Sequence, residues 1–288
     1  MAKRLGVVGF GTMGSEIALL GACGGLEVTA VDSFPEALDK GLKRLPRLLK
    51  VLSRDERFFA AAEVADDDAR RRVMGRITTD GELSALAEAD YVIEAAPENA
   101  ELKQGLLSCV EEHCRPDTLL ATNTSSISIT ALAAALKHPE RLVGMHFFNP
   151  PSSMLLVEVI PGLETAEETT AAALELAKTL GRTAIRVKET PGFVVNRVLM
   201  AMMNEAMAVL DEGVASMEDI DTALKLGAGF PLGAFKLADL VGLDVLEHAT
   251  DMVYRELGHD KFRPPHILRQ HVRAGRLGRK TRHGFYKY

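Results

Sequence analysis

A histidine, a glutamate and a glycine-rich loop are the residues of this sequence whose types and spacing could perform redox chemistry. His146 follows the apolar run 142–145, and Glu158 lies within the apolar run 156–160. An imidazole titrates near neutral pH, so it can take the proton of an alcohol while a hydride leaves the same carbon. Such a base needs a carboxylate that fixes its tautomer and stabilises the imidazolium. We therefore predict that His146 is a general base and that Glu158 orients it.

The spacing of these two residues fits a β-hairpin. If residues 149–154 form the turn with Ser152 at its centre, His146 pairs directly with Glu158 on the opposite strand. Directly paired side chains have Cβ atoms about 5 Å apart on one face of the sheet. A slip of one residue would place them on opposite faces. The alternatives are a half-buried His146 with a backbone partner and a solvated Glu158.

The glycine-rich loop Gly9-Phe10-Gly11-Thr12-Met13-Gly14 lies between an apolar strand and an apolar helix. Its first glycine permits the tight turn, the second lets the backbone approach a pyrophosphate, and the third allows close packing of helix on strand. Asp32 ends the next strand, where a carboxylate can bind ribose hydroxyls and repel a 2′-phosphate. We predict binding of NAD rather than NADP. A plain turn and a helix cap at Asp32 are the alternatives.

These residues need a sheet to position them, and the first two-thirds of the chain alternates apolar runs with helical stretches. Such alternation predicts an α/β fold, with a Rossmann-type and mostly parallel sheet. Polar residues follow three of the apolar runs, at the carboxyl ends where doubly wound sheets bind ligands. We expect strands at residues 5–8, 28–31, 91–95, 118–121, 142–147, 156–160 and 183–187.

Helices account for the remainder. The charged stretch between Asp32 and Tyr91 predicts a projecting helical pair at 36–60 and 66–76. Pro191 and Gly192 mark a boundary, after which helices are expected at 193–213, 217–226, 233–257 and 267–274. The prediction is a domain of residues 1–188 followed by an all-helical domain of residues 189–288.

Composition excludes several other classes of protein. The 288 residues carry a net charge of -6 and contain no Trp, which disfavours nucleic-acid binding. No apolar run is long enough to span a membrane, and we expect no secretory leader. Three cysteines form no disulfide framework and favour the cytoplasm. Cys109, His113 and Cys114 lack a fourth ligand at zinc-like spacing, so no metal is expected.

Taken together, the motifs resemble the L-3-hydroxyacyl-CoA dehydrogenase family, and most of all its bacterial 3-hydroxybutyryl-CoA members. The resemblance covers nearly the whole chain. Besides the glycine-rich loop, the residues that carry it are Glu98-Asn99, Asn123-Thr124-Ser125-Ser126, His146-Phe147-Phe148-Asn149-Pro150, Leu156-Val157-Glu158-Val159-Ile160, Thr190-Pro191-Gly192-Phe193, Asn196-Arg197, Gly278-Arg279-Lys280-Thr281 and Gly284-Phe285-Tyr286.

The resemblance implies roles for individual residues. Ser125 and Asn196 would hydrogen-bond the 3-oxygen and thioester region of the substrate, with Asn196 supplied by the helical domain. His146 and Glu158 would act as described above. The implied cofactor contacts outside the glycine-rich loop and Asp32 are Glu98, Lys103, Asn123, Asn149 and Lys280. Glu98 and Asn99 could instead cap the helix that begins at Ala100, and Lys280 could be a solvated residue of the tail. The resemblance also implies a homodimer.

CoA carries several phosphates, so an acidic protein needs a local cationic surface to bind it. Basic side chains recur at three- and four-residue spacings along one helical face, and Lys50 and Arg54 are our predicted contacts. A solvated helix face is the alternative. The set is Lys40, Lys43, Arg44, Arg47, Lys50 and Arg54.

We expect an NAD-dependent oxidoreductase of fatty acid metabolism that interconverts short-chain L-3-hydroxyacyl-CoA and 3-ketoacyl-CoA. Leu155 stands where the family often has lysine, and Ser152-Ser153 replace small apolar residues, so the chain-length preference is not predicted. Neither are the physiological direction and the pathway. One alternative is a gulonate-type sugar-acid 3-dehydrogenase on the same fold. Another is a catalytically silent NAD-binding structural protein.

Overall fold

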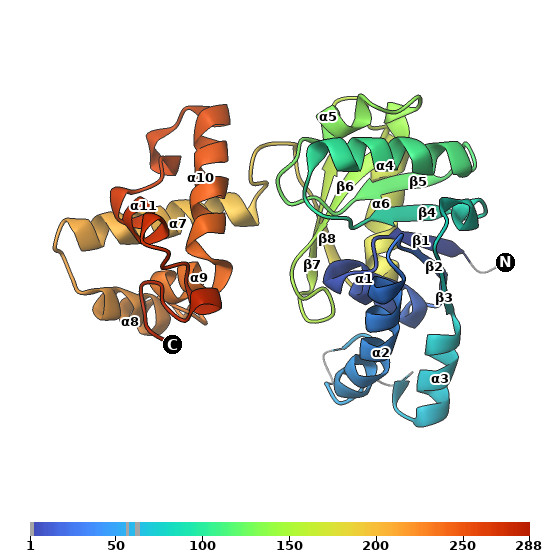
Figure 1. The fold of residues 1–288 in the computed structure, drawn as a ribbon, viewed down its shortest axis with the longest axis horizontal. Coiled ribbons are helices and arrows are strands. Elements are labelled where there is room, and N and C mark those ends of the chain that lie inside the picture. The colour runs from blue at the N-terminus through green and yellow to red at the C-terminus, as the bar shows by residue number, and fades with distance from the viewer. Residues whose placement is uncertain (1–2, 56–57, 61–63) are drawn as a thin grey trace. The chain divides into compact units, whose positions relative to one another are not determined.

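The structure is a computed structural model that describes residues 3–55, 58–60 and 64–288. The chain divides into two compact units, Met1–Glu189 and Thr190–Tyr288. The first combines a sheet with helices and the second is built from helices (Figure 1). No helix among the described residues is both long enough and apolar enough to cross a membrane.

Within the described residues, one sheet of eight strands has the order β3-β2-β1-β4-β5-β6-β7-β8. Every neighbouring pair from β3 to β6 is parallel. The strand β7 runs antiparallel to β6 and parallel to β8. This confirms the predicted Rossmann-type sheet. The strands are β1 (Arg4–Val8), β2 (Glu27–Val31), β3 (Ile77–Asp80), β4 (Tyr91–Glu94), β5 (Leu119–Thr122), β6 (Leu142–Phe147), β7 (Leu156–Pro161) and β8 (Thr183–Arg186).

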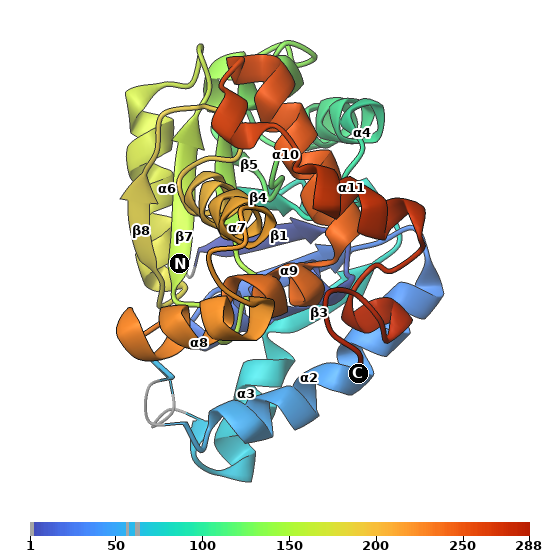
Figure 2. The same cartoon turned by 90° about the vertical axis from the view of Figure 1, so that its left-hand side faces the viewer.

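Helices cover both faces of this sheet, which is why its strands read as solid apolar runs. Buried apolar side chains of one face pack against α1 (Thr12–Cys23) and α6 (Glu167–Thr179), and α2 (Pro35–Leu52) packs on α1. The opposite face carries α4 (Ala100–His113) and α5 (Ile129–Ala133) (Figure 2). The strand order places the chain reversal between β1 and β4, beside the glycine-rich loop, where folds of this kind bind nucleotides.

Two details of this unit differ from the expectation. The edge strand β3 was not predicted, and among the described strands it pairs only with β2. The expected helix 36–60 is wrong in length, because α2 ends at Leu52. Its buried side chains Leu45, Leu49 and Leu52 would continue at position 56, where the sequence has Glu. Residues 56 and 57 of that expected helix lie outside the described residues. The second helix of the projecting pair, α3, spans Asp67–Gly75 and contacts α2.

The unit Thr190–Tyr288 contains α7 (Val195–Asp211), α8 (Met217–Gly227), α9 (Ala234–Val241), α10 (Leu243–Leu257) and α11 (His266–Arg273). The expected single helix 233–257 is wrong, because Gly242 breaks it into α9 and α10. Gly242 has φ 102°, a conformation that is strained for every other residue. Short 3-10 helices complete the chain at Leu83–Leu86, Pro139–Arg141, Asp260–Phe262 and Arg279–Thr281.

Two buried aspartates organise this second unit. Asp221 accepts hydrogen bonds from the backbone N–H of Phe235 and Lys236, at 2.9 and 3.1 Å, and so holds the start of α9. Asp239 accepts hydrogen bonds from the backbone N–H of Phe285 and Tyr286, at 2.8 and 2.9 Å. The C-terminal residues are therefore part of the packed unit rather than a loose tail.

Candidate active site

The β6–β7 hairpin places the imidazole of His146 against the carboxylate of Glu158. The two residues are cross-strand partners, which confirms the predicted register. His146 Nδ1 lies 2.8 Å from Glu158 Oε2, and neither side chain is more than 7% exposed. A carboxylate accepts hydrogen bonds, so Nδ1 carries the hydrogen of this contact. The solvated position considered for Glu158 is wrong.

The end of β6 is fixed by a side chain from the neighbouring strand's loop. Asn123 Oδ1 accepts a hydrogen bond from the backbone N–H of Phe147 at 2.9 Å. The ring of Phe148 packs 4.6 Å from the imidazole of His146. Asn149, one residue further, is exposed. His146 is thus held on one side by Glu158 and on another by an aromatic ring.

The glycine-rich loop has the geometry that its sequence predicts. A Cβ at Gly14 would lie 1.8 Å from the carbonyl oxygen of Gly9, so helix and loop pack too closely for any side chain there. A Cβ at Gly9, which has φ 90°, would lie 2.9 Å from the backbone of Ala95. A Cβ at Gly11 would meet nothing within 4 Å. The loop therefore closes tightly on itself and leaves open space beside Gly11, which suits a pyrophosphate.

A cavity of about 930 Å³ lies over this loop. Thr12, Met13 and Asp32 line it, as expected for dinucleotide contacts, and Phe34 and Arg44 line it too. Asp32 accepts hydrogen bonds from the backbone N–H of Phe10 and Phe34, at 2.8 and 3.0 Å. No side chain caps α2, so the helix-cap role considered for Asp32 is wrong.

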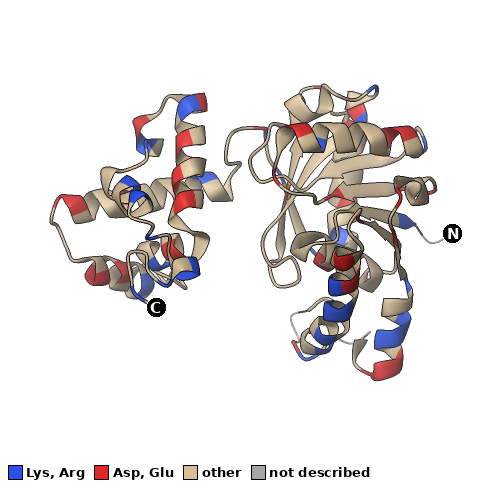
Figure 3. Ribbon diagram, in the orientation of Figure 1, with Lys and Arg blue, Asp and Glu red and all other residues tan. Residues whose placement is uncertain are grey.

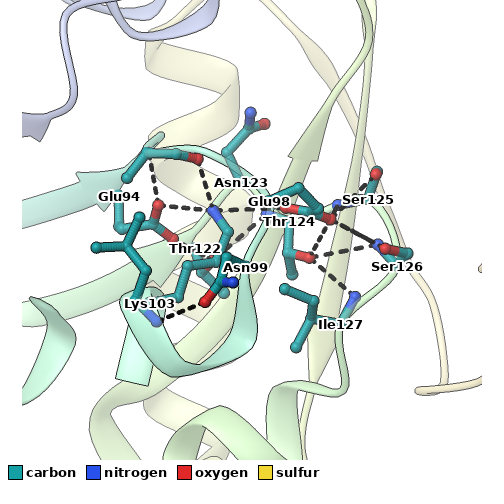
Figure 4. A network of polar contacts seen from close by, with 12 residues as sticks. Glu94, Glu98, Asn99, Lys103, Thr122, Asn123, Thr124, Ser125, Ser126 and Ile127 are labelled. Carbon is teal, nitrogen blue, oxygen red and sulfur yellow. Dashed lines mark hydrogen bonds and ion pairs between the residues drawn. The ribbon is translucent and has the colours of Figure 1, made fainter. Parts of the chain in front are cut away.

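Glu98 joins the ends of β4 and β5 through a set of hydrogen bonds (Figure 4). Its Oε1 accepts from Thr124 Oγ1 at 2.7 Å, from the Ser125 N–H at 2.8 Å and from Ser126 Oγ at 3.1 Å. Burial opposes ionisation of Glu98, but these hydrogen bonds and the Lys103 ammonium outweigh it and lower the pKa of Glu98. Asn99 caps α4 by accepting a hydrogen bond from the Leu102 N–H at 2.8 Å, which confirms the capping alternative for Asn99 but not for Glu98.

Lys103 is enclosed by protein rather than directed into the cavity. It is 1% exposed, and its Nζ lies 2.6 Å from Glu94 Oε1 and 3.5 Å from Glu98 Oε2. Glu94 also accepts a hydrogen bond from Thr122 Oγ1 at 2.6 Å. Sequence reasoning did not single out Glu94. A charged residue at the end of an otherwise apolar strand was the available signal.

The remaining predicted residues lie in different parts of the chain. Ser125 is exposed in the loop that Glu98 holds. Asn196 is half-buried in the first turn of α7, and Lys280 forms an ion pair with Asp244 at 2.5 Å. Both belong to the unit Thr190–Tyr288.

Lys and Arg residues recur along α2 (Figure 3, blue), and Lys50 and Arg54 are exposed at its end. Arg44 differs from them, because its guanidinium is bound to α1.

The thiol of Cys114 is half-buried, and burial raises its pKa to about 11. In the ranges that the structure describes, no three His, Cys, Asp or Glu side chains gather in a way that could hold a metal ion.

Models of two protein families match consecutive parts of the chain. Residues 4–190 match the 3-hydroxyacyl-CoA dehydrogenase, NAD binding domain. Residues 192–288 match the 3-hydroxyacyl-CoA dehydrogenase, C-terminal domain. The two matches together cover almost the whole chain.

Individual relatives agree with these matches. A probable 3-hydroxybutyryl-CoA dehydrogenase of Bacillus subtilis (strain 168) is 44% identical over 99% of this chain and 97% of its own length. A 3-hydroxyadipyl-CoA dehydrogenase of Escherichia coli (strain K12) is 43% identical over 99% of this chain and 59% of its own length. The crystal structure of (S)-3-hydroxybutyryl-CoA dehydrogenase from Ralstonia eutropha matches with a TM-score of 0.94 and 42% identity, covering 100% of this chain and 99% of that one. The chain belongs to the 3-hydroxyacyl-CoA dehydrogenase family of NAD-dependent oxidoreductases.

Proposed function

We propose that the protein oxidises short-chain L-3-hydroxyacyl-CoA, such as 3-hydroxybutyryl-CoA, to 3-ketoacyl-CoA, and catalyses the reverse reduction. The hydrogen-bonded pair of His146 and Glu158 is the observation that carries this proposal. The pair lies on the same sheet as β1, the strand that leads into the dinucleotide loop. The strand β6 runs parallel to β1. The names of the relatives from Bacillus subtilis and Ralstonia eutropha support the substrate class.

The side chains of this protein take the proton from the substrate and return it. Bound NAD+ supplies the acceptor for the hydride that leaves C3. His146 Nε2 takes the proton of the 3-hydroxyl, and Glu158 accepts the Nδ1–H and stabilises the imidazolium that forms. In the reductive direction the same imidazolium returns the proton to the oxygen. Ser125 and Asn196 hydrogen-bond the 3-oxygen and thioester region of the substrate.

The cofactor is held by the loop Gly9–Gly14, including Thr12 and Met13, and by Asp32. The nicotinamide end of the cofactor is contacted by Asn123 and Asn149. Glu98 and Lys103 act there through the hydrogen-bond network around Ser125, and Lys280 is a cofactor contact from the helical unit.

The phosphates of CoA are bound by Lys50 and Arg54. Their exposure at the end of α2 supports this role, because an exposed cation is accessible to a phosphate.

The reaction is tested by the oxidation of NADH, followed by absorbance, with purified protein and acetoacetyl-CoA. We expect turnover with NADH that greatly exceeds turnover with NADPH. Longer 3-ketoacyl-CoAs and the 3-oxoadipyl thioester define the acyl preference. L-gulonate with NAD+ is the competing assay, and activity on gulonate alone would overturn the proposal. Binding of NADH without turnover of either substrate would identify a catalytically silent protein.

Substitution of the proposed base tests the mechanism. His146→Ala removes the proton acceptor, so we expect turnover to fall roughly 10²–10⁴-fold. NADH binding should change little, because His146 does not line the cavity over the loop. Fluorescence titration measures that binding. His138→Ala is the control, since the imidazole of His138 is exposed and pairs with the nearby, exposed Glu140. Unchanged turnover of His146→Ala would remove the imidazole from the mechanism.

We also propose that the protein is a cytoplasmic homodimer. Its free cysteines suit a reducing compartment. The helical unit exposes large apolar side chains that a partner could cover. They include Val198, Val214, Leu226, Leu240, Val241 and Val245.

A further inference from the structure

One buried carboxylate of the unit Met1–Glu189 has no part in the chemistry described above. Glu16 lies in α1, two residues beyond the last glycine of the loop, and is 5% exposed. Burying a carboxylate is costly unless other groups bond to it. The partners of Glu16 come from two other segments, the β6–β7 turn and α2.

The first partner is the turn of the hairpin that carries His146 and Glu158. The backbone N–H of Ser152 donates to Glu16 Oε2 at 3.1 Å, and Ser152 is buried. Arg182 Nη2 lies 3.4 Å from the carbonyl oxygen of Ser152. The N–H of Ser152 is therefore bound by a side chain of α1, and its carbonyl oxygen by the side chain of the residue that precedes β8. The turn is fixed to the helix that follows the dinucleotide loop.

The second partner is Arg44 of α2. Its Nη2 lies 3.5 Å from Glu16 Oε1 and donates to the carbonyl oxygen of Thr12 at 2.9 Å and to Ser15 Oγ at 2.6 Å. Ser15 Oγ in turn donates to the carbonyl oxygen of Gly11 at 2.6 Å. Arg44 thereby connects Glu16 with the backbone of the loop itself.

We propose that Glu16 is a positioning residue that fixes the catalytic hairpin relative to the dinucleotide loop, with Arg44 as its counter-ion. The proposal rests on the proposed function, because the geometry matters only if His146 and the cofactor act on one substrate. Reacting groups must be held within a few tenths of an ångström, and a misplacement of about 1 Å can lower a rate by roughly 10²-fold. Removing Glu16 leaves the Ser152 N–H without its acceptor and Arg44 without its opposite charge.

Two substitutions separate the contacts of Glu16. Glu16→Gln keeps an amide oxygen that can accept from Ser152 and removes the charge that faces Arg44. Glu16→Ala removes both. We expect Glu16→Ala to lower kcat with acetoacetyl-CoA by about 10- to 100-fold at saturating NADH, with a much smaller change in the Kd of NADH. Glu16→Gln should recover most of the lost kcat. Glu27→Ala, at an exposed carboxylate of β2, should match the unchanged protein.

Hydrogen exchange of the peptide 146–158 gives a readout that does not depend on activity. We expect faster exchange in Glu16→Ala than in Glu27→Ala, because the turn has lost its anchor. Exchange that is equal in the two variants, or full kcat in Glu16→Ala, would overturn the positioning role. An equal loss of kcat and of NADH binding in both Glu16 variants would also overturn it, because that pattern indicates general damage. If the unchanged protein is inactive on acetoacetyl-CoA, the proposed function fails, whereas the exchange result still tests the anchor.

Discussion

Asp32 illustrates how a single side chain can be oriented before its ligand binds. Each of its two carboxylate oxygens accepts one backbone N–H, from Phe10 and from Phe34. A carboxylate has about four acceptor positions, so both oxygens can accept further hydrogen bonds from ribose hydroxyls. The charge that favours those hydroxyls also repels a 2′-phosphate.

Asp32→Ala is expected to raise the KM for NADH about 10- to 100-fold, because hydrogen bonds to a charged group contribute about 1.5–3 kcal/mol. It should also reduce the preference for NADH over NADPH. Steady-state kinetics with both cofactors measures the two effects. Asp39→Ala is the control, since Asp39 lies exposed on α2 and outside the cavity lining. A preference that stays unchanged in Asp32→Ala would restrict Asp32 to holding the loop.

At the scale of single residues, the sequence predicted a contact where the two partners are close in the chain and related by simple spacing. His146 and Glu158 could be paired because a hairpin relates positions by simple register. Glu16 was not found, because its partner Ser152 lies 136 positions away and nothing in the chain between them specifies that contact. Lys103 was identified by resemblance, but its enclosure between Glu94 and Glu98 depends on how a strand, a turn and a helix pack together.

At the scale of the elements, apolar runs in the sequence predicted the ends of the buried strands to within about one residue. Strands that are buried on both faces are apolar along their whole length, so the run is easy to recognise. The edge strand β3 has only one buried residue, Ile77, and so lacks that signal. The break at Gly242 was missed for the opposite reason. Apolar residues recur at helical spacing on both sides of it, and only the backbone angle of Gly242 ends α9.

Glu111 shows how one side chain of a helix holds a neighbouring segment. Its carboxylate accepts from the backbone N–H of Lys137 and His138, at 2.8 and 2.9 Å, and pairs with Arg141 at 3.0 Å. Burial opposes ionisation, but these partners outweigh it and lower the pKa of Glu111. The segment that leads into β6 is thereby bound to α4.

A lowered pKa in the folded state makes stability depend on pH. Ionised Glu111 stabilises the fold above its unfolded pKa of about 4.3, and this contribution is lost as the pH falls through the folded value. We expect Glu111→Gln to reduce the free energy of unfolding by about 1–3 kcal/mol at neutral pH, with the difference narrowing in acid. Urea denaturation at several pH values measures this. Glu112→Gln, at the exposed neighbour, should cause little change. A difference that is the same at every pH would show that shape, rather than charge, is responsible.

At the scale of the whole molecule, the two units are stabilised in different ways. The first is built around a sheet, with a large apolar cluster formed by its strands and by α1, α2 and α6. The second packs its helices around a cluster that includes Met200, Met207, Phe235 and Phe262. The second also leaves many large apolar side chains exposed, Leu226 at 82% and Leu240 at 50% among them. Isolated exposed side chains are ordinary, but a concentration of them indicates a surface that associates.

We expect the protein to sediment as a dimer. In a two-fold interface every substitution occurs twice, so Leu226→Glu or Leu240→Glu should shift the equilibrium toward monomer. Leu163→Glu, at a comparably exposed leucine of the first unit, should leave the dimer intact. Sedimentation equilibrium distinguishes these outcomes. A monomeric unchanged protein would contradict the homodimer, and a dimer that tolerates both Glu variants would exclude these side chains from its interface.

The antiparallel direction of β7 determines how insertions and deletions affect the pairing of His146 with Glu158. Because a turn rather than a crossover helix joins β6 to β7, the imidazole and its carboxylate are only 12 positions apart in the chain. Lengthening a surface loop anywhere else leaves their register intact. One residue added to or removed from either strand of the hairpin would turn one of the two side chains to the opposite face of the sheet. Over evolutionary time, the length of this short segment is therefore far more constrained than its distance from either end of the chain.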